Sequence, residues 1–114
     1  MIEVITGSRS GEQVLIYITA KKEAYAREIS QFYGVSLSPI QNQLNKFELG
    51  GILNSRLAGK TRLYFFNPRY AFYNELKALF EKVIEFLPKD EKERLLMARK
   101  RPRRKSKPLI VKAR

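Results

Sequence analysis

Residues 34–53, GVSLSPIQNQLNKFELGGIL, place amides and a cation on one side of a predicted helix. The apolar residues of this segment fall at helical spacing: Leu37, Ile40, Leu44 and Phe47. The residues between them are polar: Ser38, Gln41, Asn42, Asn45 and Lys46. Asn and Gln carry both a donor and an acceptor, which suits bidentate contact with adenine in the DNA major groove, while Ser and Lys reach phosphates. The alternative is an ordinary solvent-facing side, and the elements next to this helix decide between the two interpretations.

The segment before this helix completes a helix–turn–helix pattern. Residues 23–34, EAYAREISQFYG, predict a short helix that stops at Gly34. The apolar residues of that helix share one face: Tyr25, Ile29, Phe32 and Tyr33. Ser36 can cap the following helix, and Pro39 fits its first turn, where a missing N–H needs no partner. A short helix, a turn with glycine and a second amphipathic helix are typical of a helix–turn–helix.

The segment after the polar helix changes its period from helical to alternating. Residues 53–57 and 61–66 predict a β-hairpin, with a tight turn between them. Three cations flank its tip: Arg56, Lys60 and Arg62. No acidic residue lies between Glu48 and Glu75. A basic hairpin after a helix–turn–helix indicates a wing that follows the DNA backbone or enters the minor groove; the alternative is a hairpin kept soluble by its charges.

Further helices are predicted on both sides of these elements. Residues 10–19 predict a helix capped by Ser8 or Ser10. Residues 67–87 predict a long helix with a wide apolar stripe, started by Asn67 and Pro68. One more short helix is predicted to begin near residue 89, and residues 2–5 suit either a helical turn or a strand.

Positive charge is concentrated at the C-terminal end of the chain. The 114 residues contain 23 Lys and Arg against 11 Asp and Glu, a net charge of +12. Residues 1–97 hold 14 of the basic groups and all 11 acidic ones, whereas residues 98–114 hold nine basic groups and no acid. A polycation binds nucleic acid, anionic membranes or acidic protein surfaces. We expect an electrostatic arm for DNA phosphates, formed by Arg99, Lys100, Arg101, Arg103, Arg104 and Lys105.

The composition argues against several classes of function. The chain has no Cys and no His, so thiolate metal sites and the commonest metal ligand and general base are absent. The densest acids, at positions 90, 91 and 93, alternate with Lys and Arg. We therefore expect no enzyme, no cofactor and no metal. A spanning apolar run and a signal peptide are both missing, which predicts a cytoplasmic protein without a membrane partner.

The order of these elements resembles the winged helix–turn–helix of ArsR-like bacterial and archaeal transcriptional regulators over about residues 8–87. The resemblance implies groove-facing positions at Ser38, Pro39, Gln41, Asn42 and Asn45, and wing contacts at Arg56, Lys60 and Arg62. It also implies a dimer that pairs through the first and last helices. That pairing suits the wide stripe of Phe72, Leu76, Leu79, Phe80 and Val83. Family metal sensors use Cys and His, so this chain is similar to the non-metal-sensing branch.

The predicted fold is mostly α with a small β-hairpin: a winged helix–turn–helix with a three-helix core, a wing and a C-terminal dimerisation helix. It divides into a DNA-binding and dimerisation domain over residues 1–88 and a short helix with a flexible basic tail over residues 89–114. The predicted function is sequence-specific binding of double-stranded DNA by a dimeric repressor with no assigned small-molecule effector. The alternatives are a protein-interaction or architectural module whose tail docks on acidic partners or non-specific DNA, and RNA binding.

Overall fold

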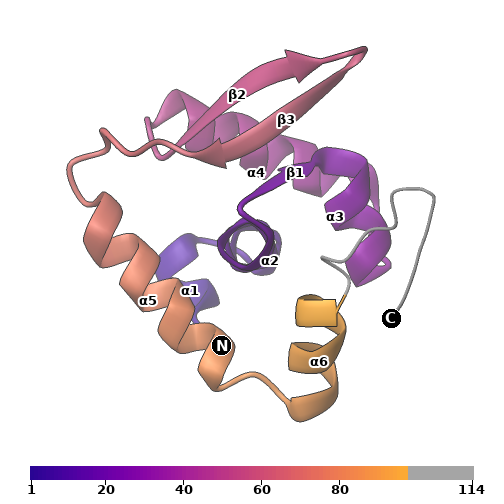
Figure 1. Cartoon of the computed structure of the whole chain (residues 1–114), viewed down its shortest axis with the longest axis vertical. Coiled ribbons are helices and arrows are strands. Elements are labelled where there is room, and N and C mark those ends of the chain that lie inside the picture. The colour runs from indigo at the N-terminus through magenta and orange to yellow at the C-terminus, as the bar shows by residue number, and fades with distance from the viewer. Residues whose placement is uncertain (98–114) are drawn as a thin grey trace, which may run out of the picture.

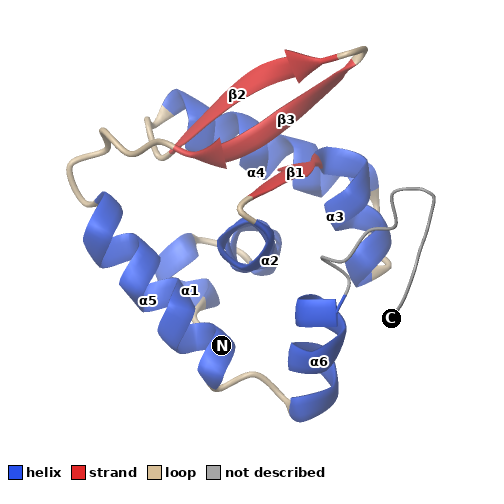
Figure 2. Ribbon diagram, viewed as in Figure 1, coloured by secondary structure: helices blue, strands red, loops and turns tan. Residues whose placement is uncertain are grey.

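The computed structural model describes residues 1–97, which fold mostly into helices with one small antiparallel sheet (Figures 1 and 2). The elements in chain order are α1 Glu3–Thr6, α2 Arg9–Lys21, β1 Glu23–Tyr25, α3 Ala26–Tyr33, α4 Leu37–Leu49, β2 Leu53–Ala58, β3 Thr61–Phe66, α5 Tyr73–Glu85 and α6 Lys89–Met97. The predicted helix over residues 10–19, the predicted helix that follows Ser36 and the predicted hairpin are confirmed. None of the helices within residues 1–97 is long and apolar enough to cross a membrane.

Helix α2 forms the centre of the molecule, and the other elements surround it (Figure 1). It begins at Arg9 because the Ser8 side chain accepts a hydrogen bond from the Gly11 N–H at 2.9 Å, which confirms Ser8 as a cap. Its residues 14–19 are all buried. They pack into one core with residues from the surrounding helices and β2: Ile29, Ile40, Leu44, Phe47, Leu53, Phe80, Val83 and Leu95. An apolar run buried on every side is what a central helix requires.

The sheet has three strands rather than the two of the predicted hairpin. Strand β1 pairs antiparallel with β3, and the strand order is β1-β3-β2. Ala24 lies opposite Tyr64, and Ser55 lies opposite Tyr64 on the other side. Residues 23–25 belong to the predicted helix over residues 23–34, and this part of the prediction is wrong: they form β1, and α3 begins only at Ala26. Three residues are too short to show an alternating pattern. Pairing with β3, some 40 residues later, is what makes this segment a strand.

Helix α5 begins at Tyr73, six residues later than the predicted start at Asn67. The Asn67 side chain does not cap this helix. Its Oδ1 accepts from the Arg69 N–H at 3.0 Å, and its Nδ2 donates to the Gly51 carbonyl at 2.9 Å. Asn readily forms such local turns in competition with a helix start. Residues 67–72 therefore form a turn anchored to the end of α4.

Helix α6 packs onto the helices that precede it in the chain. Leu95 is buried in the common core. Arg94 donates a hydrogen bond to the Phe32 carbonyl at 2.8 Å, and its guanidinium lies 4.4 Å from the centre of the Phe32 ring. Lys21 of α2 donates to the Leu95 carbonyl. The predicted division at residue 88 thus separates α6 from the helices on which it packs.

Candidate nucleic-acid interface

Helix α4 buries one face in the core and exposes the opposite face to solvent. Ile40, Leu44 and Phe47 of the predicted apolar stripe are buried between α4 and its neighbours, whereas Leu37, the first residue of the helix, is exposed. The exposed side carries five of the predicted contact residues: Ser38, Pro39, Asn42, Asn45 and Lys46. Leu49, which is 87% exposed, lies one helical turn further along this exposed face. The outward face is therefore a row of small polar groups that ends in an exposed leucine.

A tight turn fixes the angle between α3 and α4. Gly34 adopts the left-handed conformation with φ of 65°, which an L side chain rarely adopts. The Val35 N–H donates to the Ser30 carbonyl at 3.1 Å, and the Ser30 hydroxyl donates to the Val35 carbonyl at 2.8 Å. Ser36 occupies the N-cap position of α4, although its side chain makes no capping bond. The turn is thus locked by the end of α3, and α4 leaves in a defined direction.

Gln41 links α4 to the hairpin. Its Nε2 donates to the Tyr64 hydroxyl at 3.0 Å and to the Asn45 Oδ1 at 3.1 Å. Both N–H groups of the amide are thereby used. Bidentate contact with a base needs a free donor beside the acceptor. In this arrangement Gln41 has no free donor and instead orients Asn45, and the amides of α4 that stay exposed are Asn42 and Asn45.

A second link joins the hairpin to the end of α4. Arg62 on β3 donates through Nη1 to the Ser55 hydroxyl oxygen on β2 at 3.0 Å. The Ser55 hydroxyl in turn donates to Glu48 of α4 at 2.6 Å. Two hydrogen-bonded bridges, one through Gln41 and one through Ser55, therefore hold the hairpin beside α4. Figure 2 shows the two strands next to this helix.

The three predicted wing cations have different surroundings. Arg56 forms an ion pair with Glu23 of β1, with 3.2 Å between Nη2 and Oε1, and its charge is partly compensated. Lys60 is exposed in the turn at the tip of the hairpin. Arg62 is also exposed; its Nη1 donates to the neutral Ser55 hydroxyl, and within residues 1–97 it forms no ion pair. Lys60 and Arg62 are thus better placed than Arg56 to meet a phosphate.

Arg27 joins this surface, although sequence reasoning did not select it. It lies on the first turn of α3 and lines a hollow of about 230 Å³ between α3, α4 and β3. Gln41, Arg62 and Tyr64 line the same hollow. The only sequence signal for Arg27 was its place off the apolar face of α3. Its approach to Arg62 depends on the sheet that brings β3 beside β1.

Lys46 lies at the edge of the exposed α4 face. Its ammonium is 5.3 Å from the centre of the Phe47 ring and close to Gly7, in the loop between α1 and α2. The side chain is exposed, so it remains able to reach outward. Lys46 therefore lies at the margin of the exposed face and not at its centre.

The predicted dimer stripe is divided by burial. Phe80 and Val83 are buried within the chain itself, packed in the core around α2, so they offer no surface to a second copy. Leu76 and Leu79 are half-buried, and Phe72 is exposed. The stripe is wide in large part because two of its residues pack in the chain's own core, and not because all of them face a second copy.

The predicted tail contacts, Arg99 to Lys105, lie outside the described residues.

Comparison with known proteins returned no relative. No protein-family model, curated protein or solved structure matches the chain. Within residues 1–97 no group of three or more acidic side chains is placed to hold a metal ion.

Proposed function

We propose that this chain is a winged-helix protein that binds double-stranded DNA as a dimeric transcriptional regulator. One observation carries the proposal: Gln41 donates both to the exposed Asn45 of α4 and to Tyr64 of the hairpin, so the polar face of α4 and the basic hairpin are held side by side. The element order from α2 to β3 and the strand order β1-β3-β2 support a winged-helix layout. The resemblance to ArsR-like regulators supports the same assignment, and it favours a repressor.

In this proposal the contacts divide by chemistry. Asn42 and Asn45 face base edges in the major groove. Arg27, Lys60 and Arg62 hold the phosphate backbone beside that groove, and these contacts position the protein without reading sequence. A two-fold dimer would present two α4 helices to half-sites about one helical turn apart.

The deciding experiment is a titration of duplex DNA at two salt concentrations. It compares the upstream region of the protein's own gene with a scrambled duplex of equal length. A preference of about 10³ or more for the natural duplex, the low end for specific binders, would support a sequence reader that regulates its own gene. Equal binding to both duplexes that collapses with salt would contradict sequence reading and leave non-specific phosphate binding.

Replacing Asn42 or Asn45 with alanine should weaken specific binding by about 1–3 kcal/mol and relax the sequence preference. Each amide is exposed on α4 and pairs with base edges in the proposed complex. The matched control is Asn74→Ala, which removes an exposed amide from α5 instead. Titrations with specific and scrambled duplexes measure the effect. Equal losses on both duplexes would show that these residues do not read bases.

Replacing Lys60 and Arg62 with glutamine should weaken binding to every duplex and flatten the slope of log affinity against log salt by about 2. The reason is that each side chain is expected to neutralise one phosphate. Arg56→Gln should have a smaller effect, because Glu23 already pairs with Arg56. The salt slopes of the variants provide the measurement. A larger loss with Arg56→Gln than with the double variant would contradict this placement of the wing.

A second candidate, docking on another protein, is favoured by two exposed leucines. Leu49 on α4 is 87% exposed and Leu57 on β2 is 64% exposed, and both lie on elements of the proposed interface. Apolar residues can also contact thymine methyl groups. A partner that still binds after Arg56, Lys60 and Arg62 are replaced with glutamine would favour the docking function.

A further inference from the structure

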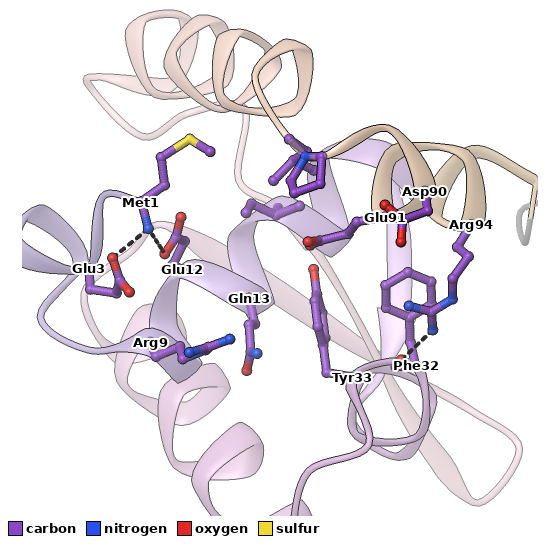
Figure 3. Close-up of a pocket in the computed structure, with 13 residues that line it drawn as sticks. Met1, Glu3, Arg9, Glu12, Gln13, Phe32, Tyr33, Asp90, Glu91 and Arg94 are labelled. Atoms are coloured by element: carbon purple, nitrogen blue, oxygen red, sulfur yellow. Dashed lines mark hydrogen bonds and ion pairs between the residues drawn. The ribbon is translucent and has the colours of Figure 1, made fainter.

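A cavity of about 530 Å³ lies where the N-terminal half of α2, the end of α3 and the α5–α6 turn meet (Figure 3). None of the residues proposed to contact DNA lines it. Its volume falls in the range of small-molecule sites in proteins. Apolar wall area comes from Ile16, Phe32 and Leu87, and polar groups come from α1, α2 and α6.

The hydroxyl of Tyr33 is a buried polar group at this cavity. It has no hydrogen-bond partner within the described residues. In Figure 3 it points towards the carboxylate of Glu91, on α6. Burial raises the pKa of Tyr33, the charges of Glu91 and Glu12 raise it further, and Arg94 opposes them. The hydroxyl therefore stays protonated, and a buried hydroxyl without a partner is unfavourable.

Some charged side chains of the cavity wall have partners within the described residues, and others form no ion pair there. Glu12, which is only 5% exposed, accepts from the Met1 ammonium at 3.1 Å, and Glu3 binds the same ammonium. Arg94 is held by the Phe32 carbonyl and ring. Within residues 1–97, no ion pair involves Asp90 or Glu91. Among the described residues, the α6 end of the cavity therefore presents the carboxylates of Asp90 and Glu91 without an ion-pair partner, and that of Glu91 lies beside the Tyr33 hydroxyl.

We propose that this cavity binds a small organic amine, with its ammonium group between Glu91 and the Tyr33 oxygen and its apolar body against Ile16 and Leu87. A primary ammonium has three donors and no acceptor. The carboxylate of Glu91 and the lone pairs of the Tyr33 oxygen supply acceptors for it, and charge-assisted hydrogen bonds are the stronger kind. Asp90 adds negative charge at the same end of the cavity.

The cavity also touches the helix–turn–helix. Phe32 and Tyr33 are the last two residues of α3, and Gly34 begins the turn into α4. A bound amine would therefore contact the last residues of α3, and these residues lead into the turn that sets the direction of α4. This second step depends on the proposed DNA-binding function, whereas binding of the amine does not.

Calorimetric titration of the full chain tests the site. The probe is tyramine, which joins an ammonium to an aromatic body, and the control is 4-hydroxyphenylacetate, which has a similar body and the opposite charge. We expect saturable binding of tyramine and none of the anion. Glu91→Gln should weaken tyramine binding by about tenfold or more. Glu93→Gln, an exposed glutamate on the same helix that does not line the cavity, should leave it unchanged.

Tyr33→Phe gives a second variant with a different readout. It removes the unpartnered hydroxyl and keeps the ring, so it should weaken tyramine binding without lowering the thermal midpoint of the free protein. No heat with tyramine, equal binding of the anion, or unchanged affinity in Glu91→Gln would overturn the proposal. Adding tyramine to the duplex titration separates the two functions: tyramine binding by a chain that binds no DNA would overturn only the DNA-binding function.

Discussion

Replacing Phe80 with alanine should lower the free energy of unfolding by about 3–5 kcal/mol. Phe80 is 0% exposed and lies in the core between α5 and α2. The substitution removes the ring from water-excluded surroundings and leaves a cavity that neighbouring side chains fill only in part. Chemical denaturation should show a lower midpoint with an unchanged slope. A loss of this size is a large fraction of the total stability of a small domain.

The matched control is Phe72→Ala, because Phe72 precedes the same helix and is 62% exposed. We expect a change within about 0.5 kcal/mol for the single chain, as for most surface substitutions. If Phe72 belongs to a dimer surface, its replacement should instead lower a midpoint that depends on protein concentration. Equal losses in the two variants at all concentrations would contradict the placement of Phe80 in the core and Phe72 outside it.

Neutralising six cations of the tail should weaken binding to all duplex DNA and strongly reduce its salt dependence. The variant replaces with glutamine the residues Arg99, Lys100, Arg101, Arg103, Arg104 and Lys105. Six phosphate contacts correspond to a loss of about 10³ in affinity between about 50 and 200 mM salt, because each contact releases condensed counterions. The variant should lose most of that dependence. Titrations of one duplex at several salt concentrations provide the slope.

The ratio between specific and scrambled duplexes should survive in the tail variant. Phosphates carry no sequence information, so an arm that binds them contributes equally to every duplex. Asn42→Ala is the complementary variant, since it should change the ratio and keep the slope. An unchanged salt slope in the tail variant would show that residues 98–114 do not act on DNA phosphates, and would favour an acidic protein partner.

Much of the helical layout and the polar face of α4 could be predicted because local rules decide them. Ser8 starts α2 with its side chain, and Gly34 ends α3 with a left-handed turn. The apolar spacing of Ile40, Leu44 and Phe47 leaves only one face of α4 for solvent. The wide stripe of α5 was found equally well, but spacing cannot tell the chain's own core from a surface for a second copy. Burial assigns Phe80 and Val83 to the core.

The sequence by itself determined that most of the helices and the hairpin form, which face of α4 is polar and where the positive charge lies. These properties depend on residues within one or two turns of each other. Only the tertiary structure decided the third strand, the ion pair between Arg56 and Glu23, and the bond from Gln41 to Tyr64. It also formed the cavity that Tyr33 shares with Glu91. Each of these joins residues more than 20 positions apart, and such contacts arise from packing around α2, which no local pattern of residues encodes.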